Sequence, residues 1–316
     1  MMKDNIANRA VMCDVLIDAA KKNQDLVVLT SDSRGSASLV KFGEALPKQH
    51  IEMGIAEQNI VSVAAGLALN GKRPFVASPA CFLSMRSIEQ VKVDVAYSDK
   101  NVKLIGISGG VSYGALGMSH HSLQDFAVTR AIPNLEVIVP ADRHETKLVF
   151  EYLVKSDKPA YVRLGRNPVE DCYTEKNVTF EIGKAHEMIS GSDVTIAAVG
   201  ETVCVAMGAA EKLAQDGISA RVLNFSSLKP FDREAVKRAI DETGSIITVE
   251  EHSVHGGLGE AIASVVAQEG KGIVRIMGLP DDNIITGTSR EVFNHYGISP
   301  DGISQEVKNI LKKVGN

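Results

Sequence analysis

The sequence has few of the residues on which nucleic-acid-binding and membrane proteins depend. Its 316 residues include no Trp, 9 Phe and 6 Tyr, which argues against an extended base-stacking surface. Acidic residues outnumber basic ones, 39 to 34, so no excess of positive charge is present to neutralise phosphates. No apolar run approaches the roughly 18 residues that cross a bilayer, and the first ten residues lack an apolar signal core. We expect no nucleic-acid partner, no membrane span and a cytoplasmic location.

Cysteine is also scarce. The four cysteines, Cys13, Cys81, Cys172 and Cys204, are widely scattered and form no CxxC pair. Their spacing matches neither a zinc site nor a dense disulfide framework. We therefore expect all four to be small core residues in a reducing compartment.

What the sequence does contain is a regular alternation of short apolar, β-branched runs with longer segments of helical period. The predicted strands are 26–30, 74–78, 102–108, 137–140, 160–164, 194–200, 220–224, 245–250 and 273–276, and the predicted helices are 8–22, 57–70, 85–98, 143–156, 202–215, 233–242 and 259–269. Strands that are apolar on both faces, each followed by a helix, are typical of parallel sheets covered on both sides. The pattern predicts an α/β protein with two doubly wound domains.

The alternation breaks once, between Asn167 and Ser192. This segment holds a proline, a charged run at 170–176 and a Ser-Gly-Ser turn, and no long helix is predicted in it. A second series of strands and helices then begins at Asp193. We therefore place a domain boundary near residue 185, which gives domains over 1–184 and 185–316.

Self-contained catalytic motifs are not found. Residues 66–73 nearly form a phosphate loop, but Arg73 offers no hydroxyl to Mg²⁺ and the order is helix then strand. Gly71 is better explained as the residue that ends a helix. His252 and His255 follow a predicted strand without the i, i+4 spacing of a helical zinc site. Residue patterns alone therefore predict a fold but no chemistry.

One segment carries a more specific signal. Residues 51–60 read Ile-Glu-Met-Gly-Ile-Ala-Glu-Gln-Asn-Ile and continue into a small-residue run at 64–68. This block resembles the pyrimidine-binding domain of thiamine-diphosphate enzymes, and transketolase and deoxyxylulose-phosphate synthase in particular. The resemblance covers essentially the whole chain in order, through 82–83, 108–121, 131–134, 139–142 and 163–166, and then 228–232 and 249–252 in a domain similar to the transketolase C-terminal domain.

The family's diphosphate-binding domain is not recognisable in the chain. Its Gly-Asp-Gly motif, which holds Mg²⁺ and the diphosphate, does not occur among the 316 residues. The resemblance therefore implies the C-terminal subunit of a split transketolase. It also implies thiamine diphosphate and Mg²⁺ (or Ca²⁺) held mainly by a separate N-terminal diphosphate-binding subunit, in an α2β2 heterotetramer.

Glu57 is the principal catalytic candidate. The resemblance implies that it donates a hydrogen bond to N1′ of the aminopyrimidine, which favours the imino tautomer that takes the thiazolium C2 proton. A carboxylic acid donates this bond only while it holds its proton, and desolvation in an apolar site favours that form. A place in the first turn of a helix favours the charged form instead. We expect desolvation to dominate.

The resemblance places four further residues in the cofactor site. Phe82 matches an aromatic residue that packs on the pyrimidine ring, and Met85 and Ile88 stand where transketolase usually has aromatic residues. That exchange keeps the pocket apolar but weakens ring stacking. Asp32 matches an aspartate at the cofactor and subunit interface, although it is explained equally well as a turn residue after a strand.

A substrate site is implied as well. His120 matches the family histidine that polarises the substrate oxygen beside the reacting carbons. Arg9, Ser36 and Arg166 fall where transketolase grips the sugar phosphate, a task for which arginine forks are suited.

Two positions depart from the family pattern. Ser108 stands in place of a histidine, and Leu116 in place of an aspartate that senses a sugar hydroxyl. A hydroxyl facing Leu116 is left without a partner, which disfavours an ordinary polyol substrate. We therefore predict transfer of a two-carbon ketol unit from a ketose phosphate to an aldose phosphate. The pair is predicted to differ from the standard xylulose 5-phosphate and ribose 5-phosphate of pentose phosphate metabolism, and a branched sugar phosphate is one possibility.

Two alternatives stay open. The β subunit of the decarboxylating component of a 2-oxo-acid dehydrogenase has a similar length, fold and glutamate, although 108–121 and 131–142 resemble transketolase more closely. A catalytically silent partner subunit is the other, and the joint presence of Glu57, Phe82 and His120 argues against it. No chemistry is predicted for the C-terminal domain, where packing and assembly are favoured over an anion site at its glycine-rich turn.

Overall fold

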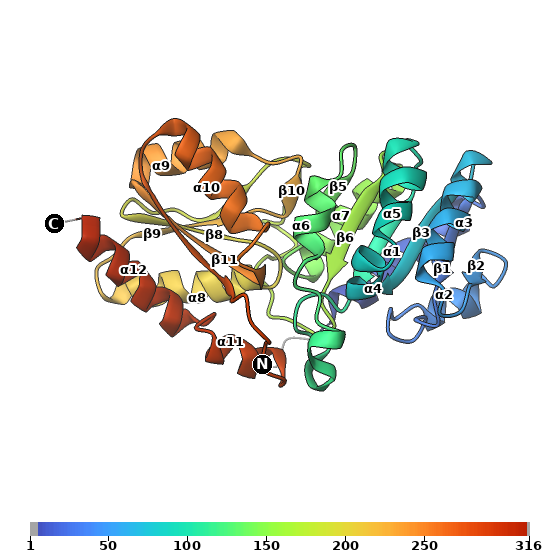
Figure 1. The fold of residues 1–316 in the computed structure, drawn as a ribbon, viewed down its shortest axis with the longest axis horizontal. Coiled ribbons are helices and arrows are strands. Elements are labelled where there is room, and N and C mark those ends of the chain that lie inside the picture. Colours follow the sequence, from blue (N-terminus) through green and yellow to red (C-terminus); the bar gives the residue numbers. More distant parts are fainter. Residues whose placement is uncertain (1–5, 315–316) are drawn as a thin grey trace.

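The strands lie in two sheets, one in each of two halves that stand side by side in Figure 1. The structure is a computed structural model and describes residues 6–314. Its strands are β1 (Leu26–Thr30), β2 (His50–Glu52), β3 (Arg73–Pro79), β4 (Lys103–Ile107), β5 (Glu136–Ile138), β6 (Ala160–Leu164), β7 (His186–Ile189), β8 (Val194–Ala198), β9 (Ala220–Asn224), β10 (Ser227–Lys229), β11 (Ser245–Ser253) and β12 (Ile273–Leu279). The first sheet has the order β10-β5-β6-β4-β3-β1-β2 and the second has β12-β11-β8-β9-β7.

Helices cover both faces of each sheet (Figure 1), so the predicted α/β architecture is confirmed. They are α1 (Asn8–Lys22), α2 (Val40–Ala45), α3 (Glu57–Leu69), α4 (Ala80–Met85), α5 (Ile88–Gln90), α6 (Asp125–Ala131), α7 (Arg143–Lys155), α8 (Thr202–Gln215), α9 (Arg233–Thr243), α10 (Leu258–Glu269), α11 (Ser289–His295) and α12 (Pro300–Val314). The helix predicted over 85–98 is instead divided among α4, α5 and a π-helical turn at Val91–Tyr97.

Two strands depart from the predicted all-parallel arrangement. Within residues 6–314, β7 runs antiparallel to β9 and β10 runs antiparallel to β5, whereas the other pairings are parallel. β10 belongs to the second half by sequence but closes the edge of the first sheet, where Ser227 lies opposite Ile138. The Lys229 ammonium also donates a hydrogen bond to the Arg130 carbonyl oxygen at 3.0 Å. The first sheet therefore includes one strand, β10, from the second half of the chain.

The apolar core is continuous between the halves. One cluster of buried side chains begins under α3 with Ile60 and Val61 and reaches Leu258 and Ile262 of α10. A second cluster fills the space between α8, α12 and the second sheet. A third lies under α1 and α7, where Phe150 is fully buried. Close packing across the junction holds the two halves in a fixed relation.

A buried ionic cluster lies where the halves meet. Arg163 of β6 pairs with Asp125 of α6 at 3.5 Å and with Glu251 of β11 at 2.7 Å, and all three side chains are buried. Glu251 also accepts a hydrogen bond from the Val111 backbone N–H at 2.9 Å. Gly110 has no room for a side chain, because a Cβ there would overlap the Glu251 carboxylate and the Arg163 guanidinium. The cluster ties the first sheet to the second.

A further carboxyl group, that of Glu201 at the start of α8, faces the same cluster. Its Oε1 atom is buried and has no hydrogen-bond partner among residues 6–314. Burial and the neighbouring charge of Glu251 raise the pKa of Glu201 to about 8, although the Arg163 guanidinium lowers it. Glu201 therefore keeps its proton in the folded protein at neutral pH.

We expect Glu201→Gln to remove a pH dependence of stability. A carboxyl group whose pKa is raised on folding contributes stability that is complete below its unfolded pKa and is lost as the pH rises through its folded pKa. Between about pH 5 and pH 8, the free energy of unfolding of the wild type should fall relative to that of the variant, by on the order of 2 kcal/mol. Urea unfolding of both proteins across this range measures the difference. Glu211→Gln, at an exposed position of α8, is the control, and a wild-type curve parallel to that of Glu201→Gln would contradict the assignment.

The N-terminus of α10 already holds a carboxylate of the chain. Glu250 accepts hydrogen bonds from the N–H groups of Leu258 and Gly259, at 2.7 and 2.8 Å. Burial raises the pKa of Glu250 to about 7, although these bonds lower it. The His252 ring stacks on Phe126 at 4.7 Å, and burial lowers the pKa of His252 to about 3. Glu250 therefore caps α10, and the His252 ring packs at the junction between the halves, whereas His255 is exposed and pairs with Glu260.

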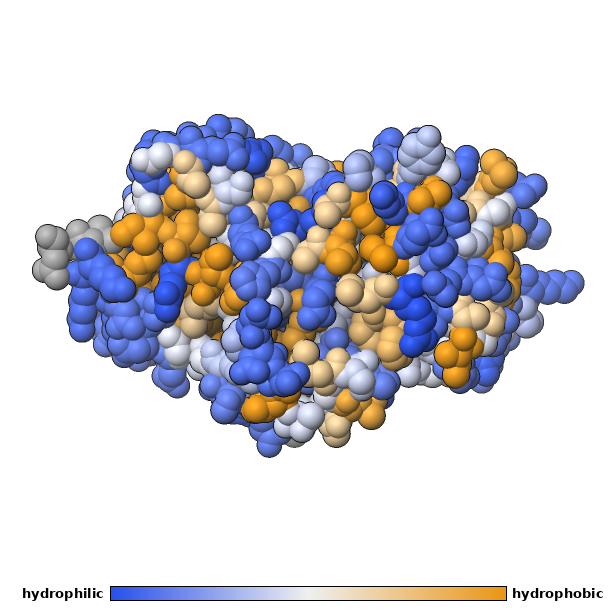
Figure 2. Space-filling model, viewed as in Figure 1, coloured by the Kyte–Doolittle hydropathy of each residue, from blue (hydrophilic) through white to orange (hydrophobic). Residues whose placement is uncertain are grey.

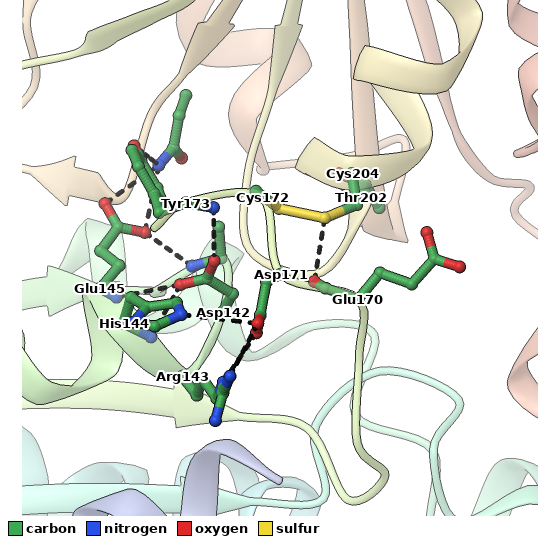
Figure 3. Close-up of a disulfide and its surroundings, with 12 residues drawn as sticks. Asp142, Arg143, His144, Glu145, Glu170, Asp171, Cys172, Tyr173, Thr202 and Cys204 are labelled. Carbon is green, nitrogen blue, oxygen red and sulfur yellow. Dashed lines mark hydrogen bonds and ion pairs between the residues drawn. A yellow bond between two sulfur atoms is a disulfide. The ribbon is translucent and has the colours of Figure 1, made fainter. Parts of the chain in front are cut away.

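The segment between the two sheets is anchored on the first half (Figure 3). Asp171 accepts two hydrogen bonds from Arg143 at the start of α7, both 2.9 Å long, and these bonds lower the pKa of Asp171. Asp142, which caps α7, accepts a hydrogen bond from the Tyr173 backbone N–H at 2.7 Å. Residues 167–192, all of which the structure describes, contain no helix, as predicted, but they do contain the short strand β7, which was not predicted.

The prediction that all four cysteines are unpaired core residues is wrong for two of them. Cys172 in this segment and Cys204 in the first turn of α8 form a disulfide, with Cα atoms 5.3 Å apart (Figure 3). The reason is the course of the segment. Asp171 and Tyr173, on either side of Cys172, are bonded to Arg143 and Asp142, and this places Cys172 against α8. Cys13 and Cys81 are free and buried, as predicted, and burial raises the pKa of Cys81 to about 12.

Candidate active site

The candidate residues gather at the edge of the first sheet where its parallel strands end. Glu57 follows β2, Phe82 follows β3, and the 3₁₀ turn at Gly114–Ser119 follows β4. Arg166 follows β6, and Arg9 lies in the first turn of α1. Ligands of open α/β sheets bind outside this carboxyl edge of the strands. The fold thus brings together residues that are up to 157 positions apart, from Arg9 to Arg166.

Glu57 is held by a cation. It is the first residue of α3, and its side chain is 3% exposed. Its Oε2 atom accepts a hydrogen bond from Arg86 Nη1 at 2.7 Å. The Arg86 Cζ atom lies 4.4 Å from the centroid of the Phe82 ring. The expectation of a carboxylic acid in an apolar site left out this guanidinium, because Arg86 is not part of the motif that identified Glu57.

A planar aminopyrimidine fits this place. A guanidinium is flat, donates hydrogen bonds and stacks on aromatic rings. Here the Arg86 guanidinium makes the two contacts that the family resemblance implies for the pyrimidine ring, which are stacking on Phe82 and a hydrogen bond with Glu57. Met85 lies three residues after Phe82 on α4 and is 49% exposed, so it adds apolar surface next to the ring. The side chains present match the pyrimidine half of thiamine diphosphate.

His120 lies between two aromatic rings. Its ring centroid is 5.2 Å from that of Phe82 and 5.3 Å from that of Tyr113, and both contacts are edge-on. The Ser119 hydroxyl lies 2.9 Å from His120 Nδ1. With Nδ1 engaged in this way, a substrate oxygen would meet Nε2.

Two arginines lie next to Tyr113. The Arg166 Cζ atom is 5.2 Å from the Tyr113 ring centroid. Arg9 donates a hydrogen bond to the backbone carbonyl oxygen of Ser36, and its Nε atom is buried without a hydrogen-bond partner among residues 6–314. Burial and the nearby charge of Arg166 lower the pKa of Arg9. Two cations held close together form a site for an anion, because the anion relieves their repulsion.

These contacts form one continuous series, which we call the contact line. It begins at a buried carboxylate, passes an aromatic ring and a histidine, and ends at a pair of cations. Its members are Glu57, Arg86, Phe82, His120, Tyr113, Arg166 and Arg9.

Four of the predicted residues are not members of the contact line. Met85 lies next to it on α4, Ser36 touches it only through the backbone carbonyl that Arg9 bonds, and Asp32 and Ile88 lie apart from it. Asp32 is exposed and has a left-handed backbone with φ of 54°, and its N–H donates to Glu52 Oε1 at 2.7 Å. Burial of Glu52 is outweighed by this and other hydrogen bonds, which lower the pKa of Glu52. Ile88 is half-buried and packs against the core shared by the two halves. Their roles, like those of the other candidate residues, stay predictions.

The two departures from the family pattern differ in exposure. The Ser108 hydroxyl is buried and has no hydrogen-bond partner in the described part of the chain. Leu116 is 53% exposed and Met118 is 39% exposed. Both belong to the turn at Gly114–Ser119, which projects at the lower edge of Figure 1, and Figure 2 shows apolar surface there. An apolar turn thus stands close to His120.

Arg86 and Tyr113 were not identified from the sequence. Arg86 lies in the break between α4 and α5, one position after Met85. Tyr113 lies within 108–121, which had been recognised only as a segment. The available signal was position, since Arg86 lies next to Met85 and Tyr113 lies inside 108–121. As to metals, no group of three or more His, Cys, Asp or Glu side chains suited to an ion is found within residues 6–314. In the same part of the chain, no helix has the length and apolar character of a membrane span.

Comparison with known proteins identifies the family. Residues 4–170 match the model of the transketolase pyrimidine-binding domain, and residues 183–303 match that of the transketolase C-terminal domain. The chain is 48% identical over 313 residues to one of the subunits of apulose-4-phosphate transketolase from Phocaeicola vulgatus, and the match covers 99% of this chain and 100% of that protein. It is 39% identical over 273 residues to 6-deoxy-6-sulfo-D-fructose transketolase subunit SqwH of Clostridium sp. (strain MSTE9), covering 86% and 84% of the two.

A solved structure agrees with these relatives. It is described as a split-gene transketolase in an inactive β4 tetramer, and it matches with a TM-score of 0.89 at 35% identity, covering 97% of this chain and 99% of that chain. The fold and the matched domains define a subunit of a thiamine-diphosphate-dependent enzyme class. The chain belongs to the transketolase family, and it corresponds to the C-terminal subunit of a split transketolase, as predicted.

Proposed function

We propose that this chain, together with a separate diphosphate-binding subunit, transfers a two-carbon ketol unit from a ketose phosphate to an aldose phosphate. The observation that carries this proposal is the contact line, which joins a pyrimidine-type site to an anion-type site through one histidine. A phosphorylated sugar whose phosphate lies at the arginines has its other end directed toward His120.

Each end of the contact line has a chemical role in the proposal. When bound, thiamine diphosphate supplies the nucleophilic carbon that carries the two-carbon unit. Glu57 holds and exchanges the proton at the pyrimidine nitrogen, and Phe82 fixes the ring plane. His120 donates a hydrogen bond to the substrate oxygen, and Arg9 and Arg166 bind the phosphate.

The diphosphate and its Mg²⁺ (or Ca²⁺) are assigned to the partner subunit. The proposal is that this partner covers the carboxyl edge of the first sheet in an α2β2 assembly. The apolar residues exposed at this edge, which include Ile55, Met85 and Leu116, support an interface there. Asp32, exposed after β1, would lie at the same interface.

The proposed substrate is a sugar phosphate other than the standard pentose phosphates. The exposed Leu116 side chain offers no hydrogen bond to a hydroxyl. A donor sugar that lacks a hydroxyl facing Leu116, or carries a branch at that position, therefore loses no binding free energy. The names of two relatives support a non-standard sugar, since one is an apulose-4-phosphate transketolase subunit and the other a 6-deoxy-6-sulfo-D-fructose transketolase subunit.

A steady-state screen with the reconstituted pair tests the function. The donors are apulose 4-phosphate, 6-deoxy-6-sulfofructose, fructose 6-phosphate and xylulose 5-phosphate, with an aldose phosphate as acceptor. We expect ketol transfer, with xylulose 5-phosphate inferior to at least one of the others. Acetyl transfer from a 2-oxo acid to a lipoyl carrier would instead identify a 2-oxo-acid dehydrogenase subunit. A preference for xylulose 5-phosphate by orders of magnitude would contradict the substrate assignment.

Replacing Leu116 by Asp is expected to shift this preference. The new carboxylate restores a hydrogen-bond acceptor for the polyol hydroxyl, so kcat/KM for xylulose 5-phosphate should rise about tenfold relative to the preferred donor. The ratio of the two kcat/KM values measures the shift. Leu69→Asp, an exposed position on α3, is the matched control and should leave the ratio unchanged. An unchanged ratio in Leu116→Asp would show that this position does not select the donor.

A further inference from the structure

Arg86 holds the position that the cofactor ring requires. Its guanidinium is 4.4 Å from the Phe82 ring centroid and 2.7 Å from the Glu57 carboxylate oxygen. An aminopyrimidine that stacks on Phe82 and bonds Glu57 needs the same two surfaces. Both groups are flat, and only one of them fits between the ring and the carboxylate at a time.

The side chain is free to leave this position. Arg86 is 46% exposed, whereas its partner Glu57 is 3% exposed. Arg86 lies at the C-terminal end of α4, where the helix breaks before α5. A half-exposed arginine regains water when it moves outward, which limits the free energy needed to displace it.

The pairing also occupies the Glu57 carboxyl group that the ring would need. An ion pair with a guanidinium uses the ionised carboxylate. Donation of a hydrogen bond to a pyrimidine nitrogen uses the protonated acid. Arg86 and the pyrimidine ring therefore make alternative hydrogen bonds with one carboxyl group, and each excludes the other.

We propose that Arg86 is a positioning residue that competes with the aminopyrimidine for Phe82 and Glu57 and is displaced when the cofactor binds. It keeps the buried carboxylate paired and the aromatic face covered until a ligand with the correct ring replaces it. This inference rests on the proposed function. It adds a selectivity step, since a ligand that carries a diphosphate but no pyrimidine does not displace Arg86.

Calorimetry on the reconstituted pair tests the competition with two ligands. Thiamine diphosphate and inorganic pyrophosphate, each with Mg²⁺, are titrated into wild type, Arg86→Met and Arg86→Lys. The expected result for Arg86→Met is a five- to tenfold tighter affinity for thiamine diphosphate, the size that the loss of a half-exposed ion pair and a cation–π contact gives. Its affinity for pyrophosphate should stay within about twofold of wild type. Arg86→Lys retains a competing cation and should resemble wild type for both ligands.

Arg275→Met is the charge-matched control. Arg275 lies on β12, 59% exposed, and pairs with Glu306, so its replacement removes the same charge far from the first sheet's carboxyl edge. The unfolding midpoint of each variant checks that the fold is kept.

The outcomes separate this inference from the function on which it rests. If Arg86→Met binds thiamine diphosphate no more tightly than wild type does, the proposed competition is wrong. An equal gain in affinity for thiamine diphosphate and pyrophosphate also overturns it, because that result is a general charge effect. If the wild-type pair binds no thiamine diphosphate at all, the proposed function fails and the inference falls with it. Binding by wild type with no selective gain in Arg86→Met overturns the inference alone.

Discussion

Glu57→Gln in the reconstituted pair is expected to lower kcat by about 10²- to 10⁴-fold, the range that loss of general acid–base catalysis gives. Gln keeps the size and the burial of the side chain, but its amide neither accepts nor releases a proton at the pyrimidine nitrogen. Steady-state kinetics at saturating cofactor and substrate measures the loss. Because Glu57 is 3% exposed and bonded by Arg86, the variant should be checked for its unfolding midpoint before the rates are compared.

Glu89→Gln is the control for this substitution. Glu89 is exposed on α5 and bonds only its neighbour Gln90 among the described residues, so the same chemical change there should leave kcat unaltered. Unchanged turnover in Glu57→Gln would contradict the catalytic role and would favour a silent partner subunit.

Replacing either Arg9 or Arg166 by Met is expected to raise KM for the phosphorylated sugar by about 10- to 100-fold, with a smaller effect on kcat. Each arginine can supply charge-assisted hydrogen bonds to a phosphate. The loss of one such bond weakens binding by about 10- to 100-fold. Burial, and after it the charge of Arg166, lowers the pKa of Arg9, and we propose that the two cations serve one anion. Replacing both should therefore have less effect than the product of the single changes.

The phosphate-free substrate provides the internal control for these arginines. With the corresponding unphosphorylated ketose, wild type and both variants should have similar kcat/KM values. Arg238→Met, on the exposed face of α9, removes a charge elsewhere and should change neither substrate's KM. Equal losses with phosphorylated and unphosphorylated sugars would show that the arginines support the fold or the histidine and do not hold the phosphate.

The elements that could be predicted from the sequence are those with a complete local pattern. The bounds of α1, α8, β1, β6 and β9 match the predicted ranges because each combines an unbroken apolar period with clear flanking residues. β10 could not be predicted, since its three residues form a strand only through pairing with β5 of the other half. β7 is four residues long and only half-buried at a sheet edge, so it carries no strong alternation. The break after α4 likewise has no proline or glycine to mark it.

Some residues of the candidate site could likewise be predicted from the sequence and others could not. Glu57, Phe82 and His120 were available from motifs that resemble a known family, and the structure brings all three onto the contact line. Arg86 and Tyr113 were not, because their importance comes from which side chains they touch across loops that are distant in the sequence. The disulfide was missed for the same reason, since 32 positions separate Cys172 from Cys204 and only the anchored course of the segment brings them together.

The central claim is that this chain supplies half of an active site that is completed by a separate subunit. Calorimetric titration of thiamine diphosphate and Mg²⁺ into the chain alone, the diphosphate-binding subunit alone and the mixture tests it most directly. We predict tight, saturable binding by the mixture only. Tight binding by this chain alone would contradict the claim, and so would the absence of binding by the mixture.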